Sequence, residues 1–481
     1  MSDAPALHAL TRRHFFRDCT LGVGKMALAS LLAESALRAD PASSGPRGPH
    51  FPPKAKSVIY LFMAGGPSQL DMYDYKPQLN KLDGQPIPQS IIEGKRFAFM
   101  DSSFNLKNTP KILGTTRKFA RHGQCGAWVS ELYPHVAKVV DDLTFLKTLT
   151  TEQVNHAPAK LFANTGSGLF GRPSMGAWIT YGIGSESEDL PGFVVLISEI
   201  NGRSPQPIAA RQWHSGFLPG RFQGIAFQSK GDPVHYLNSP DGVTTGRQRD
   251  VIDAVEALNR VHDRAVGDPE ISTRISQYEI AFRMQASVPG LMDISAEPRR
   301  VLQMYGAEPG RPSFASNCLL ARRLAERGVR FIQLYHRDWD HHGDLVDYMK
   351  QCAESVDQAT AALIRDLKQR GMLEETLLVW GGEFGRTPMG QGGKGSTLGR
   401  DHHMKGFSMW LTGGGVKGGI SYGATDDLGY NAVENVVEVH DLHATMLHLL
   451  GIDHKRMTYK FQGRDFRLTD VRGNVVRPIL A

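Results

Sequence analysis

Continuous apolar runs that end in glycine or in ionisable residues constrain this chain more than any other feature. They are KSVIYLFMAGG (56–66), LPGFVVLI (190–197), GVRFIQLY (328–335), ETLLVWGGEFG (375–385) and FSMWLTGGG (407–415). A strand that is buried on both faces has an apolar residue at nearly every position. Helical periods such as CLLARRLAERG and AALIRDLKQRGML lie between the runs. The alternation predicts an α/β fold, with helices on both faces of a mostly parallel central sheet.

Ionisable residues gather where these predicted strands end. Asp71 follows the first run, HRDWDHHGD (336–344) follows the third, Glu383 follows the fourth, and GRDHH (399–403) precedes the last. Open α/β sheets bind their ligands at the carboxyl ends of the strands. Carboxylate oxygen and imidazole nitrogen are the usual ligands of zinc and other divalent ions. We therefore expect a metal site, for one or two ions of zinc, manganese, iron or calcium.

Two segments resemble parts of sulfatases. NHAPAKLFANTG (155–166) has the frame of the sulfatase nucleophile motif, with Pro at plus two, a basic residue at plus four and Thr-Gly from plus nine. His156 stands at the position of the catalytic Cys or Ser, and Lys160 stands at that of the arginine. VHDLHATMLHLLGID (439–453) resembles the helix near the end of sulfatases.

Further motifs extend the resemblance over nearly all of the chain after residue 55. Together with GGPSQLD, WDHH, WGGEFGRTP, GRDHH, GGGVKGG and GRDFRLTDVRG, these segments resemble the DUF1501 family, exported relatives of the alkaline phosphatase and sulfatase superfamily. The resemblance implies an alkaline phosphatase-like three-layer α/β/α sandwich over residues 56–481. It also implies an enzyme that cleaves sulfate or phosphate esters, including those of polysaccharides.

The resemblance suggests ligands for a first metal ion. Alkaline phosphatases hold one metal with an Asp, a His four residues later and a distant His before a strand that ends in glycine. Asp338 and His342 have that spacing, and His402 fits the distant histidine. Asp340 lies between the first two and is a competing ligand.

The second metal of the resembled family takes an Asp after the first strand and an Asp-His pair after a later strand. Asp71 and Glu383 fit as carboxylates, but Phe384 stands where the histidine belongs. His156 has no oxygen nucleophile, so we expect it to replace the lost imidazole and leave metal-activated water to attack. Two alternatives stay open: attack by the imidazole through a phosphohistidine, and a noncatalytic centre that binds metal or glycan.

Three other polar residues are candidates for contact with an anionic substrate. Asn155 could donate a hydrogen bond to it, and Lys160 and Arg386 could complement its charge. For Arg386 a salt bridge beneath the FGRTP loop is the alternative. We expect catalytic or binding roles at His156, Asn155, Lys160 and Arg386.

The amino-terminal segment predicts export. TRRHFFR (11–17) fits the twin-arginine motif, a weakly apolar stretch follows over 21–37, and a Pro-rich segment comes next. This order predicts a twin-arginine signal peptide over 1–39, a linker over 40–55 and a periplasmic or secreted protein that engages the twin-arginine machinery.

Residues 205–297 are predicted to be an insertion that caps the cleft. Its stretch 250–286 has mixed charge and a helical period, without a sustained coiled-coil heptad. The aromatic residues Trp213, Phe217 and Phe222 could stack on a sugar, but we expect them to fill a core.

Charge and hydropathy exclude two classes of partner. The net charge is +6, yet the basic residues are scattered among nearly as many acidic ones, which argues against nucleic acid. No run of about 18 apolar residues is present, which argues against an integral membrane protein. The sequence therefore predicts an exported, metal-dependent ester hydrolase, with a noncatalytic sulfatase-like binding protein as the alternative.

Overall fold

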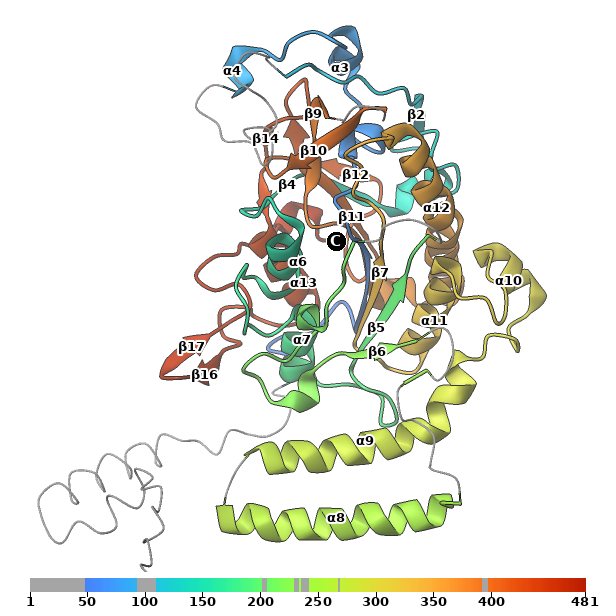
Figure 1. Ribbon diagram of the computed structural model, residues 1–481, viewed down its shortest axis with the longest axis vertical. Coiled ribbons are helices and arrows are strands. Elements are labelled where there is room, and N and C mark those ends of the chain that lie inside the picture. Colours follow the sequence, from blue (N-terminus) through green and yellow to red (C-terminus); the bar gives the residue numbers. More distant parts are fainter. Residues whose placement is uncertain are drawn as a thin grey trace, which may run out of the picture. The chain divides into compact units, whose positions relative to one another are not determined.

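The central sheet of this computed structural model joins strands that are distant in the sequence (Figure 1). The structure describes residues 48–92, 110–200, 206–228, 233–234, 242–266, 269–391 and 397–481. The strand order is β12-β4-β11-β8-β1-β7-β5-β6, and β15 pairs with β4. The strands are β1 Ser57–Met63, β4 Thr144–Thr150, β5 Phe193–Ser198, β6 Ile225–Phe227, β7 Phe331–His336, β8 Thr376–Gly381, β11 Phe407–Thr412, β12 Ile420–Tyr422 and β15 Val437–Glu438.

The middle of the sheet is parallel, as the sequence predicts. β1 runs parallel to both β7 and β8, with Val58 opposite Phe331 and Leu377, and β5 is parallel to β7 and β6. β11 is antiparallel to β8 and β4, and it makes the sheet mixed toward that edge. Each of the five predicted strands forms, and β4, β6, β12 and β15 extend the sheet beyond them.

Both faces of the sheet are buried, which explains the continuous apolar runs. Successive side chains of a strand point to opposite faces. In β1, Ile59 and Leu61 belong to the core on one face, whereas Val58 and Tyr60 belong to the core on the other.

Helices cover the two faces separately (Figure 1). α11 Phe314–Glu326 and α12 Leu345–Gln369 pack on the face that includes Ile59. α6 His156–Thr165, α7 Met175–Ile183 and α13 Val439–Leu449 pack on the opposite face. The predicted three-layer α/β/α sandwich is therefore confirmed, and α13 is the predicted carboxyl-terminal helix.

The remaining described elements are short, apart from the insertion. The helices are α3 Pro77–Lys81, α4 Gln89–Ile92 and α10 Arg299–Tyr305. Antiparallel pairs join β2 Phe119–His122 with β3 Ala127–Ser130, β9 Gly385–Gln391 with β10 Gly399–His403, β13 Ala424–Thr425 with β14 Ala432–Glu434, and β16 Tyr459–Phe461 with β17 Arg464–Phe466. The pair of β9 and β10 carries part of the site described below.

The described part of the predicted insertion contains two long helices. The helical stretch expected over 250–286 is divided between α8 Thr245–Val266 and α9 Pro269–Met292. Trp213 and Phe222 are buried in the core on the face of the sheet that includes Val58, as expected of core residues. β6, which lies between these aromatic residues and α8 in the sequence, adds an edge strand to the central sheet.

The helical pair lies at the amino end of β5 and does not form the cap that the sequence suggested. Arg283 and Ser287 of α9 donate hydrogen bonds to the carbonyls of Glu188 and Asp189, which precede β5. The ionisable residues lie at the carboxyl ends of the strands. The insertion reaches them instead through Gln206, the first residue of its described part.

The predicted signal peptide, residues 1–39, lies outside the described residues, as does the linker up to residue 47. The rest of the linker contacts the end of α13, because the amides of His50 and Lys54 donate to the carbonyls of Gly451 and Leu449, each at 2.8 Å. None of the described helices is long and apolar enough to cross a membrane.

Candidate metal centre

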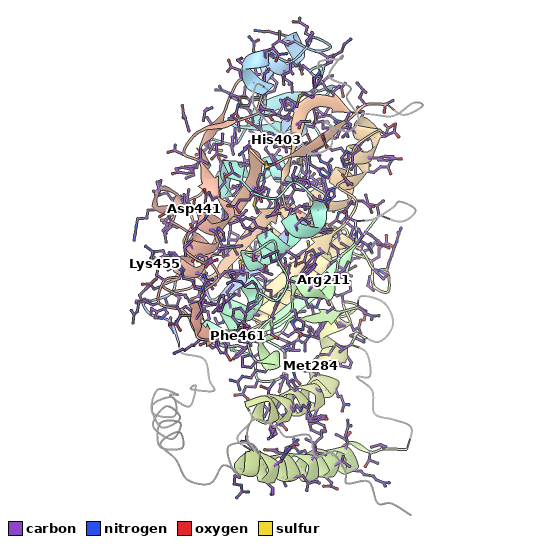
Figure 2. All side chains as sticks on the ribbon, turned by 60° about the vertical axis from the view of Figure 1, so that its left-hand side comes forward. Arg211, Met284, His403, Asp441, Lys455 and Phe461 are labelled. Carbon is purple, nitrogen blue, oxygen red and sulfur yellow. The ribbon has the colours of Figure 1, made fainter. Side chains whose placement is uncertain are left out.

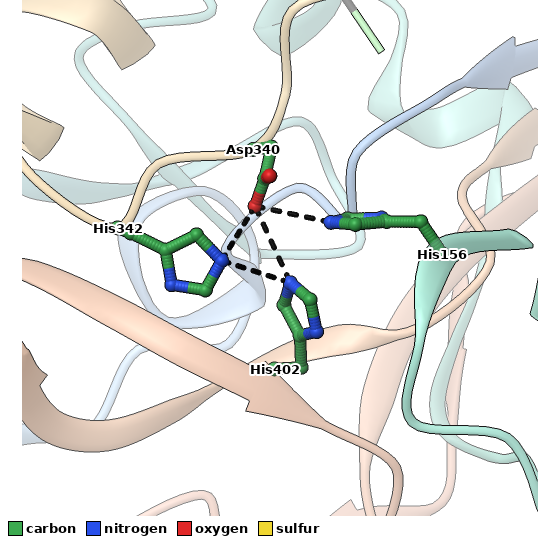
Figure 3. Close-up of side chains that lie close together, drawn as sticks. All are labelled: His156, Asp340, His342 and His402. Atoms are coloured by element: carbon green, nitrogen blue, oxygen red, sulfur yellow. Dashed lines mark hydrogen bonds and ion pairs between the residues drawn. The ribbon is translucent and has the colours of Figure 1, made fainter. Parts of the chain in front are cut away.

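Three histidines and one aspartate from three segments converge near the carboxyl ends of the strands (Figure 3). Asp340 and His342 lie in the loop after β7, His402 lies on β10, and His156 is the first residue of α6. One potential ligand atom from each residue lies within 4.8 Å of all the others. We call these four residues the His–Asp cluster.

Asp340 Oδ1 is the common partner of the three imidazoles. It lies 3.1 Å from Nε2 of His156, 2.9 Å from Nε2 of His342 and 3.3 Å from Nε2 of His402. The Nε2 atoms of His342 and His402 are 3.0 Å apart. Three nitrogen atoms and one carboxylate oxygen therefore face one point, and their types suit a transition-metal ion.

The other ring nitrogen of each imidazole lies at hydrogen-bond distance from an oxygen. These Nδ1 contacts are Glu383 Oε1 at 2.7 Å from His156, the Val154 carbonyl at 2.8 Å from His402 and Gln391 Oε1 at 2.5 Å from His342. Because such oxygens only accept, Nδ1 donates in each of these contacts, and in the neutral tautomer the Nε2 lone pair points toward the centre. Histidines that bind metals are commonly oriented by a partner of this kind.

The environment favours the ionised carboxylate and a neutral imidazole. Burial opposes ionisation of Asp340, but the three imidazoles and the charge of Arg386 outweigh it and hold the pKa of the carboxyl well below its usual value. Burial lowers the pKa of His402 to about 3, so this imidazole is neutral near pH 7. Burial also opposes protonation of His156, yet the carboxylates of Asp340 and Glu383 outweigh it and raise its pKa.

Arg386 is fully buried and fixes Asp340. Its Nη2 lies 2.6 Å from Asp340 Oδ1, its Nε donates to the Gly66 carbonyl at 2.7 Å, and its Nη1 donates to the Arg400 carbonyl at 2.9 Å. Each nitrogen of the guanidinium is thus engaged by the protein. This geometry favours the salt-bridge interpretation of Arg386 over contact with substrate.

A glycine lets the loops after β1 and β7 approach each other. Gly65 has a φ of +125°, and a Cβ there would lie 2.5 Å from the backbone nitrogen of Asp340. Its amide donates to both carboxylate oxygens of Glu383, at 3.0 and 3.2 Å. Glu383 therefore holds the loop after β1 and the ring of His156 together.

Glu383 lies behind His156 and outside the His–Asp cluster, although the sequence suggested a direct ligand. Burial opposes ionisation of Glu383, but the hydrogen bond and charge of His156 outweigh it and keep the carboxyl pKa below its usual value. The ring of Phe384 packs against the rings of His156 and His402, with centroids 4.9 and 4.5 Å apart. The resemblance placed a second metal at this position. The structure has there Glu383, which orients the imidazole of His156, and the apolar ring of Phe384.

Asp71, the other carboxylate expected at a second metal, is closed by a buried ion pair. Arg400 Nε lies 2.9 Å from Asp71 Oδ2, and the Ser68 hydroxyl donates to the same oxygen at 2.5 Å. Burial opposes ionisation of Asp71, but Arg400 outweighs it and lowers the carboxyl pKa. Among the described residues, the structure does not bring Asp71 and Glu383 into one ligand group.

Asp338 turns away from the cluster, although its spacing from His342 suggested a ligand. Its backbone has a φ of +82°, and its Oδ2 accepts a hydrogen bond from the amide of Ile200 at 3.1 Å. Asp340, the competing candidate, faces the imidazoles in its place. The four-residue spacing therefore does not identify the aspartate of this cluster.

The two remaining candidates lie at the start of α6 and within it, outside the cluster. Asn155 is the exposed N-cap residue and makes no side-chain capping hydrogen bond. Lys160 is buried, and its Nζ donates to the Pro207 carbonyl at 2.6 Å. Gln206, the neighbour of Pro207, donates to Asp340 Oδ2 at 2.8 Å. Lys160 therefore positions the beginning of the insertion against the cluster.

The groups that orient the ligands are not apparent from the sequence. Gln206 and Gln391 are single amides in weakly patterned segments, and the contact of Val154 is made by its backbone carbonyl. No local pattern identifies such groups. Arg400 did carry a signal, because a basic residue two positions before His402 in GRDHH is a natural partner for a carboxylate at a strand end.

Residues 55–480 match the model of a family described as "Protein of unknown function (DUF1501)". No curated protein matches the chain.

Three solved structures that are similar to the chain are a sulfatase, an alkaline phosphatase and a phosphonate monoester hydrolase. The PsFucS1 sulfatase from Pseudoalteromonas sp. is 14% identical with a TM-score of 0.33, over 89% of this chain and 71% of that one. The alkaline phosphatase from the Antarctic bacterium TAB5 is 11% identical with a TM-score of 0.29, over 82% and 98%. The phosphonate monoester hydrolase SpPMH from Silicibacter pomeroyi is 10% identical with a TM-score of 0.35, over 88% and 76%. Likenesses at this level assign no activity to the chain.

Proposed function

The chain belongs to the DUF1501 family, and we propose that it is a metal-dependent hydrolase of sulfate or phosphate esters. The observation that carries the proposal is the orientation of three Nε2 atoms toward Asp340 Oδ1. In the neutral form of each ring, Nδ1 donates to its oxygen and the Nε2 lone pair points toward the other rings and toward a carboxylate. A bound cation removes this repulsion.

The donor set restricts the metal that the cluster would hold. His156, His342 and His402 would each bind through Nε2, and Asp340 would bind through a carboxylate oxygen. Imidazole nitrogen suits zinc and iron, whereas calcium prefers oxygen ligands. We propose zinc or iron ahead of manganese and calcium. When bound, such an ion would act as a Lewis acid toward an anionic ester and would activate water.

At position 156 the chain supplies orientation rather than an oxygen or sulfur nucleophile. Position 156 offers neither a hydroxyl nor a thiol, and both nitrogens of His156 face carboxylates, which argues against a phosphohistidine. Glu383 and Arg386 hold His156 and Asp340 in place from behind the cluster. The sulfatase-like frame of residues 155–166 supports anionic esters, including those of polysaccharides, as substrates.

Metal content is the first test. We would measure it by elemental mass spectrometry on the full chain, purified without chelator. We expect about one equivalent of zinc or iron, because the described residues offer a single set of four donor atoms. His402→Ala and Asp340→Ala should remove it, whereas His214→Ala, at an exposed histidine outside the cluster, should retain it. Folded protein that contains no metal and takes up no added zinc or iron would contradict the proposal.

Ester hydrolysis is the second test. The metal-loaded chain would be assayed with p-nitrophenyl sulfate, p-nitrophenyl phosphate and sulfated sugars. His402→Ala would again be the test variant, and His214→Ala its control. Hydrolysis that is lost only in His402→Ala supports the proposed enzyme. Metal binding without hydrolysis would support the alternative, a noncatalytic sulfatase-like protein that binds metal or glycan. The histidine at position 156 favours this alternative, because it replaces the catalytic Cys or Ser.

We also propose that residues 1–39 direct export through the twin-arginine pathway. The TRRHFFR motif, the weakly apolar stretch and the Pro-rich segment support this in their order along the chain. Replacing Arg12 and Arg13 by lysine should leave uncleaved precursor in the cytoplasm, as cell fractionation would show, while Arg38→Lys should be exported normally. Unchanged export of the double variant would refute the assignment.

A further inference from the structure

The outer side of α8 carries an apolar stripe that no element among the described residues covers. Val251, Leu258 and Val261 are 55, 70 and 60% exposed. Ala254, which lies between the first two, is also exposed. These positions recur at alternating intervals of three and four residues, which is the a and d pattern of a coiled coil. Exposed aliphatic side chains aligned on one face indicate an interaction surface.

The stripe lies on the side of α8 away from the rest of the protein, except at Val251, which is at its edge. α9 packs on the main core through Met284, which is 2% exposed, and α8 lies on the other side of α9 (Figures 1 and 2). Val251, at the edge of the stripe, and Ile252 and Val255, on the inner side of α8, line a cavity of about 720 Å³ against the body. α8 therefore has two apolar sides, and intramolecular packing uses only the inner one.

We propose that the outer stripe docks a second copy of this chain, with the two α8 helices antiparallel. Such a pair would place Val251 opposite Val261 of the second copy and Ala254 opposite Leu258, so that small and large side chains alternate in the seam. The arrangement is symmetric, because each helix offers the same residues to the other. This inference is independent of the proposed metal centre.

Charge complementarity favours a second copy and fixes the antiparallel direction. Asp250 and Arg264 flank the same edge of the stripe near opposite ends of α8, and both are exposed. In the antiparallel pair Asp250 of each copy lies beside Arg264 of the other, and Ala257 meets Ala257 at the centre. A parallel pair would place Asp250 beside Val255 and would lose both ion pairs. A seam of two heptads is short, so we expect a dissociation constant in roughly the micromolar range.

Sedimentation velocity on the full chain, from about 1 to 100 µM, tests the dimer across that range. We expect a concentration-dependent dimer that Leu258→Glu weakens about tenfold or more, because the change puts two carboxylates into the seam. Val471→Glu is the matched control, since Val471 is 80% exposed but lies in a different part of the chain. A monomer at every concentration would overturn the proposal, as would a dimer that is equally sensitive to both variants.

Charge reversal tests the direction. Asp250→Arg and Arg264→Asp should each weaken the dimer about tenfold, because each places like charges side by side. The double variant should restore it, since the ion pairs re-form with reversed polarity. Circular dichroism and metal content should stay unchanged in all of these variants, because the residues are exposed and distant from the cluster. Failure of the double variant to recover would overturn the antiparallel pairing.

Discussion

Asp340 and Asp71 both follow strands in the middle of the sheet, yet their carboxylates face different types of side chain. Asp340 faces three imidazoles, which can be neutral and can share a cation with it. Asp71 faces the guanidinium of Arg400, whose permanent charge already neutralises the carboxylate. One strand end is therefore a candidate metal site and the other is a closed ion pair.

The difference originates in one short strand. β10 supplies Arg400 to Asp71 and, two residues later, His402 to Asp340. The pairing of β10 with β9 shifts register between these two residues. A cationic side chain that cannot lose its proton excludes a metal, whereas an imidazole can bind one. Whether a carboxylate at a strand end can bind a metal therefore depends on the side chain that the tertiary structure places beside it.

The largest expected effect is on stability, from Arg400→Met. The variant leaves Asp71 charged and unpaired in buried surroundings, which typically costs about 3–5 kcal/mol. Chemical denaturation would measure the free energy of unfolding. Adding Asp71→Asn in the same chain should recover part of the loss. A loss below about 1 kcal/mol would show that the pair is not the closed contact described here.

The second prediction concerns the support of the cluster. Glu383→Gln should lower metal affinity about 10- to 100-fold, because a neutral amide orients His156 less firmly than a carboxylate does. Competition with a chelator would measure the affinity, and Glu374→Gln, at an exposed position, is the control. Unchanged affinity would show that Glu383 does not act through His156.

A third prediction concerns the dependence of stability on pH through Asp71. Since the pKa of Asp71 is lowered in the folded chain, its contribution to stability is complete above the pKa of an unfolded Asp, about 3.9, and is lost as the pH falls toward the folded value. Below roughly pH 4 the wild type should lose up to about 1.4 kcal/mol per pH unit relative to Asp71→Asn. Urea denaturation at a series of pH values would measure the difference. Parallel curves for the two proteins would contradict the assigned ion pair.

The smallest expected effect is that of Asn155→Ala. Asn155 is exposed and makes no side-chain capping hydrogen bond, so the free energy of unfolding should change by less than about 0.5 kcal/mol. Metal affinity should not change. A large loss of hydrolysis with unchanged metal content would instead assign Asn155 to substrate binding and enlarge the site beyond the cluster.

The sequence predicted the layers of the fold well because a strand that is buried on both faces is a continuous run of apolar residues. Every residue of β1 and β8 is buried, and both strands appear as uninterrupted apolar runs. β4 was missed because Lys147 and several threonines interrupt its run. The stripe on α8 was missed because two heptads are too short to distinguish from an ordinary amphipathic helix without knowledge of exposure.

The sequence by itself determined the type of fold and the set of residues from which a site could be built, because hydrophobic periodicity and ionisable strand ends are properties of short segments. Only the tertiary structure decided that His156, Asp340, His342 and His402 converge while Asp71, Asp338 and Glu383 do not. Contacts between residues hundreds of positions apart depend on loop geometry, strand register and the side chain that reaches each carboxylate first. None of these is encoded in the spacing of a local motif.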